Sequence, residues 1–286
     1  MDEVRGEFPY ILSPLSSACR DGRTKVAFRL LDRGADPNFY PVSSTPSESG
    51  DPPSLWGPIQ WAANNGHTAI VERLLKEGAD INDNRGNGGM TPLILASQKG
   101  HADAVRFLLS RGADKGLKAE DRTTALIESS KRGRTKVVET LLAAGFDVNA
   151  VDEKNVSSLI YAARQGHIDI VKLLTAHEAD LNVQDQWGVN ALMLACQRYH
   201  LDIVLHLLSL GCDVNAQDDE EWTALMMACS DGRIDVVRLL LDHGADPLIC
   251  DRDGKKAIDL TSSPEIQTLL NGLILLSFHH HHQHVP

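Results

Sequence analysis

A period of 33 residues runs through most of this 286-residue chain and limits its possible folds more than any other feature. The first marker of the period is a Leu or Ile at positions 15, 59, 93, 126, 159, 192, 225 and 258, with spacings of 44, 34, 33, 33, 33, 33 and 33. Two glycine markers keep the same register, at Gly22, Gly66, Gly100, Gly133, Gly166 and Gly232 and at Gly34, Gly78, Gly112, Gly145, Gly211 and Gly244. Three markers in one register indicate a tandem array, whose units must stack because none can bury its apolar face alone.

Each unit is predicted to hold two helices. Thr91 can cap the first helix, and Pro92 suits its first position because the missing N–H would be unsatisfied there. The second helix carries apolar residues at helical spacing, as in the segment 170–174. Gly112 and Gly244 supply the left-handed residue that ends it. The pattern therefore predicts an all-α chain.

The units resemble ankyrin repeats. The segments that carry the resemblance are Thr91-Pro92-Leu93, Gly100-His101, Gly112-Ala113-Asp114, Asp80-Ile81-Asn82 and Asp213-Val214-Asn215. The resemblance implies an ankyrin-repeat solenoid of about seven full repeats plus a C-terminal capping half-repeat, with β-hairpin loops between repeats. The last unit, from Lys255 to about Asn271, is expected to have a first helix and a short second one.

The predicted solenoid covers residues 9–271. An N-terminal tail of residues 1–8 precedes it, and a Pro- and Ser-rich insertion at 39–56 interrupts it. We interpret this insertion as a loop, and a binding or phosphorylation segment is the alternative. For the C-terminal tail, 272–286, the sequence leaves open a longer last helix, a disordered segment and a purification tag, because five histidines lie near its end.

Three departures from the family pattern have structural consequences. The family usually places a His directly after the Leu or Ile that is the first marker of each unit, and this His ties neighbouring hairpins. Here that position holds other residues, such as Gln60 and Ile94. We therefore expect weaker polar ties between hairpins. Glu178 replaces the glycine of the closing turn, which follows the second helix of a unit. Tyr199 replaces the glycine of the inter-helix turn, which joins the two helices of a unit. A non-glycine residue in a left-handed conformation costs on the order of 1 kcal/mol. One explanation is neutral sequence change that a stable array tolerates. The other is that Tyr199 is retained because it contacts a partner.

Composition excludes several classes of function. The formal net charge of −11 disfavours binding to nucleic acid or to an anionic membrane. No basic start followed by an apolar run suggests a secretory signal, and no segment reaches the roughly 20 apolar residues of a membrane span. The five cysteines are scattered, which is typical of a reducing compartment. We expect a cytoplasmic or nuclear protein, or one found in both.

Residues able to support catalysis or bind metal have simpler explanations. Cys196, His200 and His206 have a spacing that could suggest zinc. Cys196, however, occupies a small-residue position of the first helix, as Cys19 and Cys229 do. The turn histidines His67, His101, His167 and His200 recur at one position and are interpreted as structural. We therefore predict no catalytic residue, no metal site and no cofactor, and the chain is not expected to be an enzyme.

Partner-binding residues are assigned from the resemblance, which implies that partners are held in a concave groove lined by hairpin tips and first helices. Tryptophan and arginine dominate binding energy at interfaces. Trp187, Arg198, Tyr199 and Trp222 are predicted to form one aromatic patch, and packing of these rings on the neighbouring hairpin is the alternative. The full set of predicted partner-binding residues is Trp56, Met90, Lys131, Arg132, Lys154, Arg164, Trp187, Arg198, Tyr199, Glu220 and Trp222.

Charge is uneven along the array. The segment 99–136 has ten basic and five acidic residues, and the segment 212–251 has two basic and ten acidic residues. An electrostatic field of this kind orients an approaching partner more than it sets the affinity. The alternative is that these charges only form a solvated surface and have no role in binding. The predicted function is a non-enzymatic scaffold or adaptor that binds a peptide or protein, with no nucleic-acid or membrane partner. The alternatives are an inhibitory or targeting subunit of a catalytic partner and, less favoured, an intrinsic hydrolase or zinc enzyme.

Overall fold

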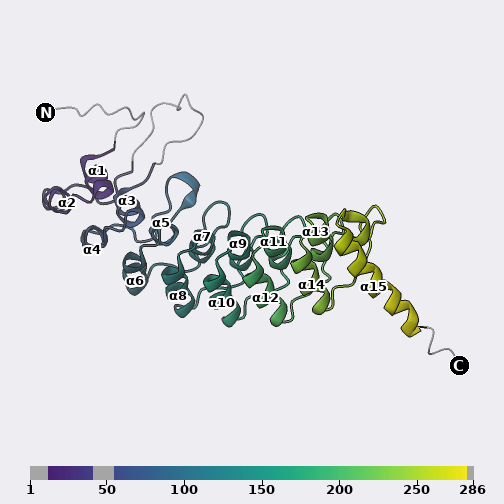
Figure 1. The fold of residues 1–286 in the computed structure, drawn as a ribbon. Helices are drawn as coiled ribbons and strands as arrows, with labels where there is room; N and C mark the ends of the chain where they lie inside the picture. The colour runs from purple at the N-terminus through teal and green to yellow at the C-terminus, as the bar shows by residue number, and fades with distance from the viewer. Residues whose placement is uncertain (1–11, 41–54, 282–286) are drawn as a thin grey trace. The chain divides into compact units, whose positions relative to one another are not determined.

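A computed structural model describes residues 12–40 and 55–281 of the chain. The predicted tail at 1–8 and most of the predicted insertion, residues 41–54, lie outside this part. The chain divides into two units, residues 1–153 and 154–286. In each unit, pairs of antiparallel helices follow one another (Figure 1). Seven pairs are described, in agreement with the predicted number of full repeats.

The helices of unit 1 are α1 (Pro14–Asp21), α2 (Thr24–Asp32), α3 (Pro58–Asn64), α4 (Thr68–Lys76), α5 (Pro92–Lys99), α6 (Ala102–Ser110), α7 (Ala125–Lys131) and α8 (Thr135–Ala143), with a 3₁₀ turn η1 (Asn87–Gly89). The helices of unit 2 are α9 (Ser158–Gln165), α10 (Ile168–Ala176), α11 (Ala191–Gln197), α12 (Leu201–Ser209), α13 (Ala224–Ser230), α14 (Ile234–Asp242) and α15 (Pro264–His281), with a 3₁₀ turn η2 (Ala257–Leu260). The odd-numbered helices up to α13 are the first helices of their pairs.

Six of the seven first helices begin at a side-chain cap, and α3 begins after Gly57 instead. The Thr91 hydroxyl accepts the Ile94 N–H at 3.2 Å, and Pro92 occupies the first turn, as predicted. Asn190 caps α11 through its side-chain oxygen in the same way. All second helices of the seven pairs except α10 are followed by a left-handed glycine, among them Gly112 and Gly244, with φ of 86° and 88°. Local sequence thus sets both ends of the helices, as predicted.

Apolar burial explains why the pairs stack within each unit. Ala62 and Ala63 on α3 are fully buried, which lets neighbouring first helices approach closely. On α10, Ile170, Val171 and Leu174 are also fully buried. In unit 2, α11 packs between α9 and α13, and α12 packs between α10 and α14. Each pair therefore covers the apolar face of the next.

Five residues other than glycine adopt a left-handed backbone in the described part of the chain. Glu178 and Tyr199 have φ of 64° and 61°, as their replacement of glycines predicts. Arg122, Asn155 and Glu221, with φ of 63°, 60° and 62°, were not anticipated. These three replace the hairpin glycine that other repeats keep, such as Gly188.

The C-terminal cap differs from the predicted half-repeat. Its first helix is only the 3₁₀ turn η2, and its second helix, α15, is 18 residues long instead of short. Ile266 and Leu270 of α15 are fully buried, and the helix continues through residue 281. The helical backbone thus includes residues 272–281 of the predicted tail, and residues 282–286 lie outside the description. No helix in the described part is long and apolar enough to span a bilayer.

Candidate partner-binding surface

The hairpins of unit 2 are closed by aspartates rather than by regular strands. Asp218 Oδ1 accepts the backbone N–H groups of Glu220 at 2.9 Å and Trp222 at 2.8 Å. Asp185 and Asp251 make the equivalent pair of bonds in the hairpins on either side. These bonds hold each tip in one conformation. No regular β-strand forms within the described residues of unit 2, and one isolated bridge joins Cys250 and Lys256.

Successive hairpin tips are joined through their backbones. The Gln186 N–H donates to the Lys154 carbonyl at 2.9 Å, and the Asp219 N–H donates to the Trp187 carbonyl at 3.0 Å. The Arg252 N–H continues the series with a bond to the Glu220 carbonyl at 3.3 Å. Trp187 and Glu220 therefore hold equivalent places in adjacent hairpins. The term hairpin surface is used below for Lys154, Gln186, Trp187, Asp219, Glu220, Glu221, Trp222 and Arg252.

Glutamine side chains add a second set of polar ties between hairpins of unit 2, which the sequence analysis did not predict. Gln184 Nε2 donates to the carbonyls of Gly188 in its own hairpin and Gln217 in the next. Gln217 Nε2 repeats the arrangement with the carbonyls of Glu221, at 2.7 Å, and Cys250, at 3.1 Å. In unit 2, these side-chain hydrogen bonds between hairpins thus come from Gln184 and Gln217, and not from the residue after the Leu that marks each unit. In unit 1, Gln60 does occupy that position, and it bonds the Arg85 and Met90 carbonyls.

The predicted tip residues of unit 2 differ in exposure. Trp187 is 54% exposed, the highest value among the large hydrophobic side chains of the described residues. Lys154 and Glu220 are also exposed, whereas Trp222 is half-buried. The alternative expectation, that both rings pack on neighbouring hairpins, is therefore not met by Trp187. Its ring gives the hairpin surface an apolar group directed to solvent.

Three acidic residues lie at the tip of the next hairpin, which is bonded to the Trp187 carbonyl through the Asp219 N–H. Asp219, Glu220 and Glu221 are consecutive and exposed. Arg252 Nη1 lies 3.3 Å from Glu220 Oε2, and Arg252 Nη2 donates to the Asp219 carbonyl. The pKa of Asp218 is raised, chiefly by burial. The backbone bonds from Trp222 and Glu220 oppose this shift, and the charges of Glu220 and Asp219 add to it. Like charges thus crowd one tip.

The residues of the predicted aromatic patch lie at the two ends of α11. Trp187 precedes α11, and Tyr199 follows its last residue, Gln197. A seven-residue helix is about 10 Å long, so these two rings lie at opposite ends of α11. Trp222 remains with Trp187 on the hairpin surface. Arg198, which caps the C-terminal end of α11, belongs with Tyr199 at the inter-helix turn. Arg164 is likewise exposed near the end of α9.

Tyr199 has partners from the next inter-helix turn. The Arg233 guanidinium lies 4.3 Å from the centre of the Tyr199 ring, and the Tyr199 hydroxyl donates to Asp235 Oδ2. This hydrogen bond lowers the pKa of Asp235 and raises the pKa of Tyr199. The ring is 39% exposed. Tyr199 thus links two adjacent turns and still presents one part of its ring to solvent.

In unit 1, Trp56 and Met90 are half-buried rather than exposed. The Trp56 ring packs edge-on against Trp61, with centroids 4.9 Å apart, and the Arg20 guanidinium lies 6.0 Å from the Trp61 ring centre. Both indole N–H groups are buried without a hydrogen-bond acceptor among the described residues. Trp56 therefore packs against α3, which leaves only part of its ring available to a partner.

Lys131 and Arg132 lie beside a buried carboxylate that the sequence analysis did not single out. Glu128 is 6% exposed and accepts a hydrogen bond from Gln98 Nε2 at 2.8 Å. Lys131 Nζ and Arg132 Nε lie 3.9 and 3.8 Å from its oxygens. These two predicted contact residues are therefore partly engaged by their own helix. The sequence signal was a Glu at a position where five sister repeats carry a large apolar or aromatic residue, namely Trp61, Leu95, Tyr161, Leu194 and Met227.

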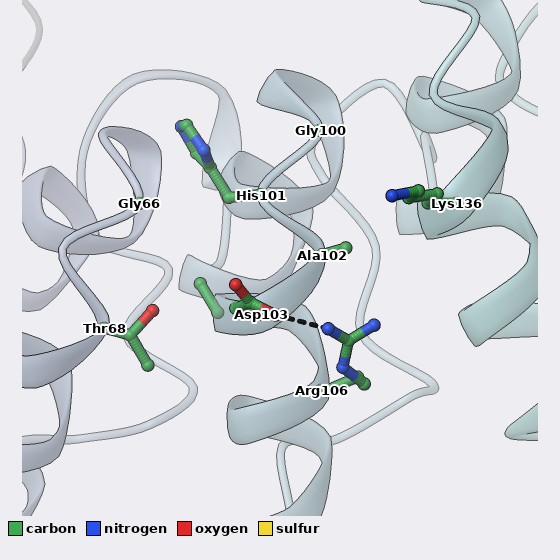
Figure 2. Close-up of a pocket in the computed structure, with 9 residues that line it drawn as sticks. Gly66, Thr68, Gly100, His101, Ala102, Asp103, Arg106 and Lys136 are labelled. Atoms are coloured by element: carbon green, nitrogen blue, oxygen red, sulfur yellow. Dashed lines mark hydrogen bonds and ion pairs between the residues drawn. The ribbon is translucent and has the colours of Figure 1, made fainter.

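Three of the turn histidines, His67, His101 and His200, bond a carbonyl of the preceding repeat, which is a structural role. His101 Nε2 is 3.0 Å from the Asn64 carbonyl oxygen, and His200 Nε2 is 3.3 Å from that of Arg164. Burial lowers the pKa of His101, which favours the neutral ring. A hollow beside this ring is lined by Thr68, Gly100, Asp103, Arg106 and Lys136 among others, and Arg106 is paired with Asp103 (Figure 2). Two of its charged side chains are thus already paired with each other.

The three residues with zinc-like spacing have separate environments. Cys196 is buried in α11, and burial raises the pKa of its thiol to about 12. His206 Nε2 lies 2.9 Å from the Thr175 hydroxyl, and His200 faces the Arg164 carbonyl. Within residues 12–40 and 55–281, no three His, Cys, Asp or Glu side chains form a group able to hold a metal ion.

Comparison with known proteins places these features in a family. The sequence model of ankyrin repeats (three copies) matches residues 46–119, 112–185 and 159–251. The human ASB11 ankyrin repeat domain, known from a crystal structure, resembles the fold with a TM-score of 0.66 and 25% sequence identity. The match covers 75% of this chain and 96% of that domain. Among curated proteins, none matches the sequence.

Proposed function

Because this chain belongs to the ankyrin-repeat family, whose repeats are generally protein-interaction modules, we propose that it is a non-enzymatic scaffold or adaptor that binds a partner protein at the hairpin surface. The observation that carries the proposal is Trp187, whose ring is 54% exposed at the tip of a hairpin held by Asp185. Large exposed aromatic groups on a rigid support are typical binding hot spots.

The hairpin surface needs little ordering before it binds. The Asp218 bonds, the tip-to-tip backbone bonds and the Gln217 ties hold its backbone in place. A pre-formed surface loses less conformational entropy on association than a mobile loop does. The Trp187 side chain has only two rotatable torsions, which limits the entropy lost when its ring is covered. These features support a recognition role for unit 2.

Affinity capture from cell extract tests the proposal with two variants. Trp187→Ala removes the exposed ring, and Leu205→Ala is the matched control because Leu205 on α12 is 47% exposed and lies outside the hairpin surface. Circular dichroism establishes that both variants are folded. We expect Trp187→Ala to lose partners that wild type and Leu205→Ala retain. Identical partner sets from all three proteins would overturn the proposal. If the captured partner is an enzyme that the chain inhibits, the regulatory alternative is favoured over a passive scaffold.

A further inference from the structure

The hairpin surface carries negative charge that the described residues do not neutralise. Arg252 pairs with Glu220, but Asp219 and Glu221 have no ion pair within the described part of the chain. All three acidic side chains are exposed and consecutive. Carboxylates this close repel one another, and a cationic group placed among them would relieve the repulsion.

An apolar anchor point lies next to this charge. The Asp219 N–H donates to the Trp187 carbonyl at 3.0 Å, so the acidic tip and the exposed ring belong to adjacent, bonded hairpins. Trp222 and Val189, the residues just before the caps of α13 and α11, are half-buried nearby in the same two hairpins. The indole face also attracts guanidinium and ammonium groups. The surface therefore combines an apolar contact with a site for positive charge.

We propose that the occupant of the hairpin surface is a basic segment of a partner protein, with an apolar or aromatic side chain on Trp187 and two or more Arg or Lys residues over Asp219, Glu220 and Glu221. This inference rests on the proposed function and adds the chemistry of the partner. Nucleic acid and acidic peptides carry the wrong sign of charge for this tip. An extended segment fits because backbone hydrogen bonds set the hairpin tips side by side. In these bonds the N–H groups of Gln186, Asp219 and Arg252 donate to the carbonyls of Lys154, Trp187 and Glu220, respectively.

Selection from an unbiased library of displayed 12-residue peptides tests the proposal without knowledge of the natural partner. The full chain is the bait, and Trp187→Ala is used for counter-selection. We expect enriched peptides to carry net positive charge and an apolar or aromatic residue beside the basic ones. Enrichment of neutral or acidic peptides, or of none that distinguishes wild type from Trp187→Ala, would overturn the proposal. Partner capture that depends on Trp187 would still support the proposed function in that case.

Affinities of one selected peptide then separate local charge from net charge. Asp219→Asn combined with Glu221→Gln removes the two unpaired charges, and we expect affinity to fall about three- to tenfold at low salt, less at high salt. The matched control is Asp169→Asn with Asp242→Asn, which changes net charge equally on the outer helices α10 and α14. We expect the control to change affinity less than twofold. Equal losses from both pairs would show a general charge effect and contradict a docking site at the tip.

Discussion

The guanidinium of Arg233 lies 4.3 Å from the centre of the Tyr199 ring. At four other inter-helix turns, those of Gly22, Gly66, Gly100 and Gly166, the glycine makes room for a side chain from the next turn. A Cβ atom at Gly22 would lie 2.5 Å from the His67 ring, and one at Gly100 would lie 2.8 Å from Arg134 Cδ. Tyr199 instead occupies a left-handed position itself and provides a ring for Arg233 to contact. The replacement of the turn glycine is thus accompanied by a specific partner.

A double-mutant cycle measures this relationship. Tyr199→Ala keeps a side chain at the left-handed position, so it removes the ring contacts without relieving the backbone strain. We expect Tyr199→Ala and Arg233→Ala to show a coupling of about 0.5–1 kcal/mol in the free energy of unfolding, because the contact is exposed. Urea unfolding followed by circular dichroism provides the measurement. Strictly additive effects would contradict an energetic contact.

The Tyr199–Asp235 hydrogen bond predicts two opposite pH effects. The pKa of Tyr199 is raised, so its contribution to stability is complete below the usual tyrosine range near pH 10 and is lost as pH rises through the higher folded value. The pKa of Asp235 is lowered, so its contribution is present above about pH 4 and is lost as pH falls.

Alkaline absorbance titration checks the tyrosine shift. The difference between wild type and Tyr199→Phe isolates the Tyr199 phenol from the other tyrosines. We expect Asp235→Asn, compared in the same way, to move that transition to lower pH, because the nearby negative charge is gone. An unchanged transition would show that the hydrogen bond does not persist in solution.

Glu221 is predicted to decrease stability while supporting binding. Its φ of 62° is a left-handed conformation in which glycine is preferred. Glu221→Gly should raise the free energy of unfolding by about 1 kcal/mol and weaken binding of a basic peptide. Arg122→Gly is the matched control, since Arg122 has φ of 63° at the equivalent hairpin position of unit 1. It should stabilise the fold similarly and leave peptide affinity unchanged. Weakened peptide binding in both variants would contradict a local role for Glu221.

Gln217 is predicted to stabilise the stacking of two hairpins. Its amide donates to the carbonyls of Glu221 and Cys250, which would lose this donor in Gln217→Ala. We expect a loss of about 1–2 kcal/mol in the free energy of unfolding. Gln186→Ala is the control, because Gln186 is an exposed tip residue whose backbone, not its side chain, forms the described bond. Equal stabilities of the two variants would refute the tie.

Most of the fold could be predicted from the repeat period and from residues close together in the sequence. The cap at Thr91, the left-handed glycines such as Gly112 and the number of helix pairs follow from residues within one unit. The Gln217 ties could not be predicted in the same way, because the amide reaches a carbonyl 33 residues further along the chain. The shortened first helix of the cap, η2, also escaped the pattern, since the period itself continues to Ile258.

The candidate site was only partly predictable. The period places Trp56, Trp187 and Trp222 near hairpins, but it contains no information on which rings find a neighbour. Trp56 packs against Trp61, and Trp187 has no such ring beside it among the described residues. Helix α11 separates Trp187 from Tyr199, and the period alone does not give the distance between the two rings. Exposure depends on the packing of side chains from adjacent repeats, which a one-dimensional pattern does not describe.

Hydrogen exchange of the chain with and without its captured partner shows whether the partner binds the hairpin surface. We expect slower exchange of backbone amides in the hairpins at 185–189 and 218–222 when the partner is bound, and little change on α12 and α14. Protection confined to those outer helices, or to unit 1, with unchanged exchange in both hairpins would contradict this expectation.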